Sequence, residues 1–474
     1  MKRSFLLFNF FILLIIILSS CKQDENSDST DVKNALSPLE ENSGSTDVET
    51  AFSPKGIPAG SNTTYNINLK MNSSEIFEVE ANIDIVNDSK DTWNELVFYL
   101  IPNIFSEKAP QALTIQEIKM DGEKVKYTLN EDTLKIQLKS GLVSNGETSV
   151  EILYDFTIPE KGLRFTKNNG NFYLAQFYPM LATYRNHRWN KEEYRFQGET
   201  YHTDFSDFYV TYHLPEGYTL VSTSPNDSYP SSTQGTLQAS QVKEFFIAIL
   251  QNPSVIEKEV NDTTIRIFGF DQEKELIQEI TELAADALTY FEKTIGLYPH
   301  DQLDIILDGM SMEYPGVVTA HSINDIALDP DPLKSTILHE LAHQWFYGVI
   351  SNDPYHEAWL DEGFAGFATG LYAYSRPNKT VPYENLYKMI ERLKPLPVNL
   401  SLDEYDSSAY IYDKTNVMLW KLFEKRGGLE EAERFLKTYY DEYLFKEVNS
   451  QEFIKFTKNY FNLKDDSVFD EWLK

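Results

Sequence analysis

The chain has 474 residues, which is enough for two or three domains. Its formal net charge of -31 repels nucleic acid, so the composition argues against a nucleic-acid-binding protein. The 29 tyrosines and 30 phenylalanines can fill large cores, which excludes a wholly disordered chain. A single cysteine excludes any disulfide within the chain.

The chain begins with the layout of a secretory signal peptide. Lys2 and Arg3 precede a nearly uninterrupted apolar run over residues 5–18, which is short for a membrane-spanning helix. The run ends in LSSC at residues 18–21, which resembles the bacterial lipobox. That resemblance implies cleavage before Cys21 and acylation of this cysteine, so we expect residues 1–20 to be removed. The protein would then be lipid-anchored on the extracytoplasmic side of a bacterial cell membrane; an ordinary signal peptide or an uncut anchor is the alternative.

Residues 21–62 are predicted to form a flexible acidic linker. They are rich in Ser, Asp, Glu, Asn and Pro and offer few apolar side chains to bury. The sequence STDV at residues 29–32 recurs at residues 45–48, but this repeat is too short and polar to be a structural unit. We therefore expect a spacer between the membrane and the folded part.

Residues 63–259 carry the pattern of β-strands. Apolar and polar side chains alternate with a period of two, and Asp121-Gly122 between apolar stretches is a hairpin signal. The clearest strands expected from this alternation are residues 65–69, 77–81, 134–138 and 208–212. We predict one N-terminal all-β, sandwich-like domain.

The pattern changes near residue 260. Residues 265–270 and 303–307 read as strands, and between them apolar side chains recur at helical spacing from Ile277 to Ile295. From Leu333 to the C-terminus the pattern is mostly helical. The prediction for residues 260–474 is therefore a second domain of the α+β class.

One helix of this second domain carries a metal-binding motif. The helix is expected from Leu333 to Gly348 and contains HELAH, which places His339 and His343 four residues apart on one face. Two imidazoles at this spacing can bind one metal ion, while Glu340 lies one step round the helix, beside the metal. The motif predicts a zinc site with Glu340 as the general base.

A catalytic zinc site needs a third protein ligand and leaves one position open. Glu362 is the candidate, because it lies 362 - 343 = 19 residues beyond His343. That length fits the rest of the first helix, a loop, and a second helix from near Glu357 to Ala373, with Pro354 near its start. We predict that one Zn²⁺ ion is held by His339, His343 and Glu362.

These motifs resemble the M1 family of metallopeptidases, the gluzincin aminopeptidases. The likeness covers HELAHQWF at residues 339–346 and WLDEGFA at residues 359–365, at the family's spacing. SMEYPG at residues 311–316 is similar to the family's substrate-amine motif, and YDK at residues 412–414 to its catalytic tyrosine motif. Weaker likeness runs through residues 176–179 and 198–210, and about 400 residues from Thr63 onward fit the family's first two domains.

The resemblance implies a fold, an activity and further site residues. The second domain would be a thermolysin-like zinc peptidase domain, and the protein an aminopeptidase that hydrolyses the N-terminal peptide bond of peptides at the cell surface. Tyr412 would donate a hydrogen bond to the tetrahedral oxyanion. Glu313 would bind the free α-amino group of the peptide, and Gln176 would line the same pocket.

Three positions depart from the family's pattern. Met310 stands where the amine motif usually begins with glycine, and Tyr314 replaces its asparagine. Thr415 follows the lysine of the tyrosine motif, where glycine is usual. The sequence ends 474 - 412 = 62 residues after Tyr412, so we expect no counterpart of the large C-terminal helical domain of longer relatives.

Two other functions remain open at this point. The first is an endopeptidase or a hydrolase of another small substrate on the same scaffold, which cleavage of free against N-acetylated peptides would separate. The second is a surface lipoprotein that binds peptides without cutting them. The complete ligand set and Glu340 argue against this second reading.

Overall fold

The structure is a computed structural model that describes residues 53–474, apart from residues 161, 196–197, 271–273 and 321–329. The predicted signal peptide, Cys21 and most of the predicted linker lie outside the described residues. Within the described part of the chain, no helix combines the length and the apolar character that crossing a bilayer requires.

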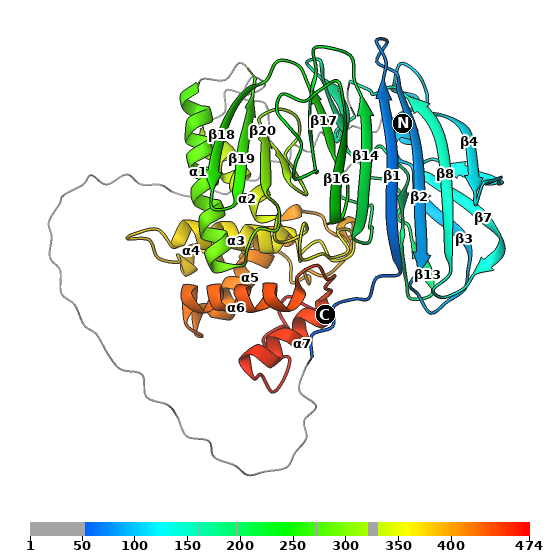
Figure 1. Cartoon of the computed structure of the whole chain (residues 1–474). Coiled ribbons are helices and arrows are strands. Elements are labelled where there is room, and N and C mark those ends of the chain that lie inside the picture. Colours follow the sequence, from blue (N-terminus) through cyan, green and yellow to red (C-terminus); the bar gives the residue numbers. More distant parts are fainter. Residues whose placement is uncertain (1–52, 161, 196–197, 271–273, 321–329) are drawn as a thin grey trace, which may run out of the picture. The chain divides into compact units, whose positions relative to one another are not determined.

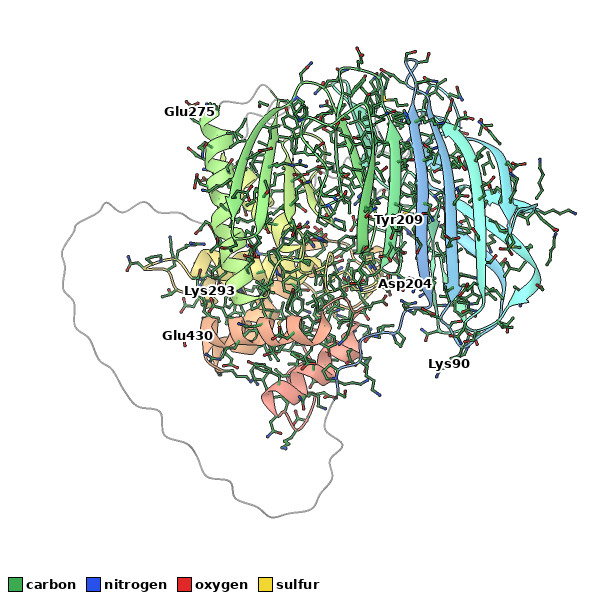
Figure 2. The ribbon with its side chains drawn as sticks, viewed as in Figure 1. Lys90, Asp204, Tyr209, Glu275, Lys293 and Glu430 are labelled. Carbon is green, nitrogen blue, oxygen red and sulfur yellow. The ribbon has the colours of Figure 1, made fainter. Side chains whose placement is uncertain are left out.

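A seven-stranded sheet forms the first layer of the N-terminal region (Figure 1). In order across the sheet, its strands are β16 (Gln234–Val242), β14 (Ser206–His213), β1 (Ser61–Met71), β2 (Phe77–Asn87), β8 (Glu147–Phe156), β4 (Thr114–Met120) and β5 (Glu123–Lys124). Neighbouring strands are antiparallel except β1 and β14, which run parallel. Every second side chain of β1 is buried, because one face of the sheet packs on the core and the other meets solvent. Tyr209 of β14, labelled in Figure 2, is exposed on the outer face.

Three smaller sheets share one apolar core with this large sheet. Their strands are β15 (Thr219–Ser222), β17 (Ile247–Leu250), β10 (Asn171–Leu174) and β9 (Phe165–Asn168); β11 (Met180–Leu181), β3 (Trp93–Tyr99), β7 (Thr133–Leu142) and β6 (Tyr127–Asn130); and β12 (Thr183–Arg185) with β13 (Arg188–Asn190). A 3₁₀ helix, η1 (Ile101–Phe105), follows β3. The core joins Ile67 and Ile83 of the large sheet to Leu96, Ile136 and Ile249 of the smaller ones. This layered packing confirms the predicted all-β, sandwich-like region.

A five-stranded sheet opens the second region. Its order is β18 (Ser254–Val260), β19 (Thr263–Gly269), β20 (Gln302–Ile306), β22 (Val317–Thr319) and β21 (Met312–Tyr314). β19, β20 and β22 run parallel to one another, and the helix α1 (Lys274–Thr294) connects β19 to β20. The helix packs on β18 and β19 (Figure 1) with its buried side, which includes Ile277, Ala284 and Phe291. The periodicity of this helix predicted its buried face, and the mixture of sheet and helices confirms the α+β class.

The boundary predicted between residues 259 and 260 stays a prediction. Residues 54–474 form one compact unit by their contacts. β18 crosses the predicted boundary, with residues 254–259 before it, and pairs over its whole length with β19, which follows it. The five-stranded sheet therefore includes residues that the sequence pattern assigned to the N-terminal region.

The remainder of the chain is mostly helical, as predicted. Its elements are α2 (Pro330–Ala342), α3 (Glu362–Tyr374), α4 (Tyr383–Ile390), η2 (Leu402–Glu404), η3 (Ser408–Tyr410), α5 (Asp413–Glu424), α6 (Gly428–Tyr443) and α7 (Ser450–Phe461). The prediction that one helix runs from Leu333 to Gly348 is wrong at its end, because α2 stops at Ala342. Beyond it the backbone tightens: the amides of Gln344 and Trp345 donate to carbonyls three residues back instead of four.

The second predicted helix also begins later than expected. Residues 354–361 form turns, and α3 begins at Glu362 instead of near Glu357. The Asp353 side chain accepts the amides of Tyr355 and His356 at 3.1 Å each, which favours a turn over a helical start. Asp361 then caps α3 by accepting the amide of Glu362 at 2.8 Å. Glu362 is consequently the first residue of α3, where a turn and a cap fix its backbone.

Candidate metal centre and active site

Three predicted ligand side chains meet in one cluster, in which both histidines are buried and Glu362 is partly buried. His339 lies in α2, His343 just beyond its last residue, and Glu362 at the start of α3; their ligand atoms all lie within 4.8 Å of one another. The Nε2 atoms of the two histidines are 3.2 Å apart, and Glu362 Oε2 lies 3.0 Å from His339 Nε2 and 3.3 Å from His343 Nε2. Tetrahedral zinc with bonds of about 2.0–2.2 Å separates its ligand atoms by roughly 3.2–3.6 Å. Both the donor set and its spacing therefore fit one zinc ion.

The orientation of His343 is set by a backbone carbonyl. Its Nδ1 atom lies 2.9 Å from the carbonyl oxygen of Phe346, which can only accept a hydrogen bond. The Nδ1 atom consequently carries the proton, and the Nε2 lone pair faces the cluster. This is the tautomer that a metal ligand requires.

Two further carboxylates, Glu340 and Glu313, are buried beside the three ligands. Burial raises the pKa of Glu340 to about 8. The charge of His343 opposes this rise, and the carboxylate of Glu362 adds to it. Burial likewise holds the pKa of Glu313 well above its usual range, and the charge of Glu199 adds to the rise. Burial opposes ionisation of Glu362, but hydrogen bonds from His339 and then His343 outweigh it and lower the Glu362 pKa. So many acidic groups in a low-dielectric site favour the binding of cationic species.

Tyr412 joins the cluster from the residue before α5. Its hydroxyl donates to Glu362 Oε1 at 2.5 Å, and its ring centroid lies 6.0 Å from that of His339. Burial raises the pKa of Tyr412 well above its ordinary value, and the charge of Glu362 raises it further. The hydroxyl therefore keeps its proton and remains a hydrogen-bond donor at neutral pH.

Gln176 is turned toward a different group. Its side chain, 2% exposed, donates through Nε2 to Glu244 Oε2 at 2.8 Å. Glu244 is itself buried and is not one of the three clustered ligands. The role that the resemblance implied for Gln176 in the substrate pocket stays a prediction.

The positions that depart from the M1 pattern have local explanations. The ring of Tyr314 stacks on Phe246, with centroids 3.9 Å apart. A Cβ added to Gly363 would lie 2.1 Å from Thr415 Cγ2, so the threonine fills space that the glycine beside Glu362 leaves free. The carbonyl of Met310 accepts a hydrogen bond from the hydroxyl of Thr319.

A buried ion pair beside the amine motif was missed by the sequence reasoning. Arg164 pairs with Glu199 at 2.5 Å, and its Nε lies 3.1 Å from the sulfur of Met312, the residue before Glu313. Glu199 falls in the stretch of weak family likeness, which was the only signal for it. Nothing in the local sequence marks Arg164, because its partner lies 35 residues further along the chain.

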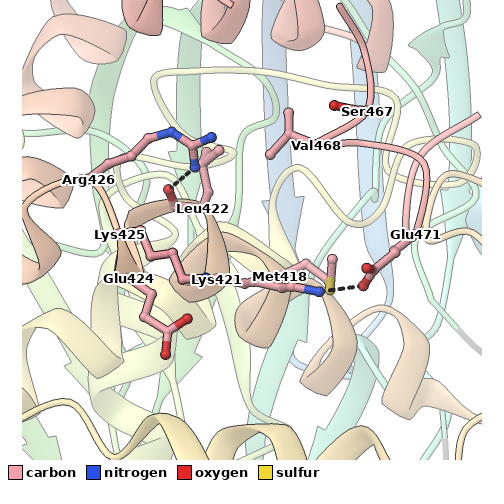
Figure 3. Close-up of a pocket in the computed structure, with 9 residues that line it drawn as sticks. All are labelled: Met418, Lys421, Leu422, Glu424, Lys425, Arg426, Ser467, Val468 and Glu471. Atoms are coloured by element: carbon pink, nitrogen blue, oxygen red, sulfur yellow. Dashed lines mark hydrogen bonds and ion pairs between the residues drawn. The ribbon is translucent and has the colours of Figure 1, made fainter.

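A separate cavity of about 330 Å³ lies at the far end of α5 (Figure 3). Its walls include the Lys421–Glu471 ion pair, together with Arg426, which donates to the carbonyl of Leu422. None of the residues predicted for the site lines it. We therefore do not assign substrate binding to this cavity.

Comparisons with known proteins agree with this geometry. Residues 280–472 match the family model described as the peptidase family M1 domain. Aminopeptidase B of Mus musculus is 25% identical over 231 residues, which are 41% of this chain and 34% of that protein. Aminopeptidase 2 of Candida albicans is 31% identical over 114 residues, which are 21% of this chain and 12% of that protein. The chain thus spans only a minor part of these relatives' length.

A solved structure matches nearly the whole chain. The crystal structure of the M1 zinc metallopeptidase from Deinococcus radiodurans superposes with a TM-score of 0.64, covering 89% of this chain and 95% of that one at 14% identity. This likeness shows a shared two-region fold. The three clustered side chains form a donor set that suits zinc. Residues 280–472, which include the three clustered ligands, are thus similar to the peptidase family M1 domain.

Proposed function

We propose that the protein is a zinc-dependent aminopeptidase that removes the N-terminal residue of peptides. The observation that carries the proposal is the gathering of Glu340, Glu313 and Tyr412 around the cluster of His339, His343 and Glu362. This set supplies a general base, an acidic partner for an ammonium group and a hydroxyl donor. The aminopeptidases among the relatives support the same activity.

The residues divide the work of hydrolysis among them. His339, His343 and Glu362 would hold a zinc ion, which would supply Lewis-acid chemistry by making water more acidic and polarising a carbonyl group. A cation bound by the cluster favours the ionised form of Glu340, and this carboxylate then accepts a proton from the attacking water and passes it to the leaving amine. The protonated hydroxyl of Tyr412 donates a hydrogen bond to the oxygen on which negative charge grows. Glu313 pairs with the substrate's ammonium group and so fixes which peptide bond is attacked.

Zinc removal tests the proposed reaction. The full chain should release amino acids from short peptides and amino-acid amides, lose this activity after treatment with a chelator, and recover it when one equivalent of zinc is returned. The same assay is repeated with peptides whose N-terminus is blocked. Cleavage of these blocked peptides identifies an endopeptidase. A zinc-loaded chain that hydrolyses neither kind of substrate contradicts the proposal and favours a peptide-binding role.

We also propose that the enzyme works outside the cytoplasm, lipid-anchored through Cys21 at the cell membrane. The support is the apolar run followed by LSSC at residues 18–21 and the polar stretch after it. The 73 acidic residues outnumber the 42 Lys and Arg residues, and such an acidic surface keeps a protein soluble beside a membrane without attracting nucleic acid.

A further inference from the structure

Tyr347 has a backbone conformation that residues other than glycine rarely adopt. Its φ angle is 123°, and the residue is buried. Such a conformation costs free energy and persists only where the surrounding structure holds it. Tyr347 follows the metal ligand His343 by four residues, so what holds Tyr347 bears directly on the metal centre.

The group that holds the Tyr347 side chain is Glu244. The tyrosine hydroxyl donates to Glu244 Oε1, although the two residues are 103 positions apart in the sequence. Glu244 lies between β16 and β17, and it is 1% exposed. It also accepts hydrogen bonds from Tyr201 at 3.0 Å and Gln176 at 2.8 Å. These three donors are neutral, so this carboxylate acts as a hydrogen-bonded anchor in the β region.

The backbone around Tyr347 is tied to His343. The carbonyl of Phe346, the preceding residue, is the group that lies 2.9 Å from His343 Nδ1. The amide of Gly348, the following residue, donates to the carbonyl of His343 at 3.0 Å. Tyr347 itself donates its amide to the carbonyl of Ile350 at 2.9 Å. A change in the Tyr347 backbone would therefore move the carbonyl that orients the imidazole.

We propose that Tyr347, anchored by Glu244, is a positioning residue for the metal ligand His343. The anchor holds the strained backbone, the backbone holds the Phe346 carbonyl, and that carbonyl keeps the Nε2 lone pair of His343 aimed at the metal. Groups that orient a metal-bound histidine typically contribute about 10- to 100-fold to metal affinity. The inference rests on the zinc site of the proposed function, but its test needs no substrate.

The test compares two tyrosines that donate to the same oxygen. Tyr347→Phe and Tyr201→Phe each remove one hydroxyl from Glu244 Oε1, but only Tyr347 belongs to the loop that carries the Phe346 carbonyl. Zinc dissociation constants of the full chain are measured by competition with a chelator of known affinity. We expect Tyr347→Phe to weaken zinc binding about tenfold and Tyr201→Phe to leave it within about twofold of wild type.

A second pair of variants separates positioning from general stability. Glu244→Gln keeps an oxygen for both tyrosines, and Gln176 can turn its amide to match, so zinc affinity should stay near wild type. Glu244→Ala should weaken zinc binding as Tyr347→Phe does. The double variant should bind zinc little more weakly than either single variant, because both substitutions remove the same hydrogen bond. Tyr347→Gly relaxes the backbone but loses the anchor; it should weaken zinc binding even where the melting temperature of the metal-free chain does not fall.

Equal zinc affinity in Tyr347→Phe and Tyr201→Phe, whether both are weakened or both unchanged, overturns the inference. A zinc affinity that only follows the melting temperature across the variants overturns it as well. A wild-type chain that binds zinc but cleaves no peptide contradicts the proposed function and leaves this inference standing. A wild-type chain that binds no zinc contradicts both.

Discussion

Glu340 lies beside the metal cluster without being one of its three ligands. Glu340→Gln keeps the size of the side chain but cannot accept a proton from water. We expect zinc content to stay near one equivalent and kcat to fall by about 10²- to 10⁴-fold, which is the usual contribution of a general base. Metal analysis and steady-state kinetics on the same preparation measure both quantities.

Ligand variants provide the control for that experiment. His343→Ala and Glu362→Ala each remove one of the three clustered donors, so they should lose zinc as well as activity. Equal zinc content in these two variants and in Glu340→Gln would contradict the ligand assignment.

Single residues were predictable where local spacing determines the chemistry. The four-residue separation of His339 and His343 and the position of Glu362 follow from helical periodicity and loop length. The bond between Tyr347 and Glu244 does not, because it joins residues 103 positions apart. The Arg164–Glu199 pair was missed for the same reason. Partners of this kind depend on the tertiary fold, which the local pattern does not specify.

At the scale of elements, the cores of helices were predictable and their ends were not. Apolar spacing correctly placed the middle of α2 and α3, but α2 ends at Ala342 and α3 begins at Glu362. Both ends are set by specific contacts: the turn before Tyr347 in one case, and the side chains of Asp353 and Asp361 in the other. Hydrophobic periodicity carries no information about such contacts.

A buried ionic cluster joins the β region to the segment between α6 and α7. His202 lies 3.0 Å from Glu447 and 3.3 Å from Asp353, and Arg185 pairs with Glu447 at 3.0 Å. Burial lowers the pKa of His202, but the charges of Glu447 and Asp353 outweigh it and raise the pKa to about 9. Burial opposes ionisation of Glu447, but His202 and Arg185 lower its pKa to about 2. The His202 pKa exceeds its unfolded value, so its stabilising contribution is complete below about pH 6.5 and is lost as pH rises through about 9.

This cluster predicts a pH-dependent effect of His202→Gln. The free energy of unfolding that the substitution removes should be largest near pH 6 and should shrink by about 3 kcal/mol between pH 6 and pH 10. Urea unfolding of wild type and variant at several pH values measures it. His300→Gln is the matched control, because burial lowers the pKa of His300 to about 4 and keeps it neutral in this range. A His202→Gln effect that is as flat as the control's between pH 7 and pH 10 would show that His202 is not charged in the folded protein.

At the scale of the whole molecule, the order of the two regions was predictable and the sheet topology was not. Alternating strands followed by helical periodicity indicated an all-β region before an α+β region. The parallel pairing of β1 with β14 joins Thr63 to Ser206, and β18 joins the second sheet instead of the first. Long-range pairings of this kind leave no mark in a local pattern of apolar residues.

The proposed anchor also belongs to this scale. Cys21→Ser removes the only thiol in the chain, so no acylated N-terminal cysteine can form. The variant should move from the membrane fraction to the periplasm or medium, whereas Ser20→Ala, which keeps Cys21 and a small residue before it, should remain membrane-bound. Immunoblots of the separated fractions measure the distribution. The anchor proposal fails if Cys21→Ser stays in the membrane fraction as firmly as wild type.

The central claim is that the zinc site recognises the free N-terminus of a peptide. The most direct test compares cleavage of one peptide with and without an N-acetyl cap. An acetyl group removes the positive charge that Glu313 is proposed to bind. Because an unpaired member of a buried charge pair costs about 2–5 kcal/mol, wild type should cleave the free peptide at least about 30-fold faster than the capped one. Glu313→Gln should lose this preference while keeping its zinc, since Glu313 is outside the three clustered ligands. Equal cleavage of both forms by wild type would contradict the account and identify an endopeptidase on the same scaffold.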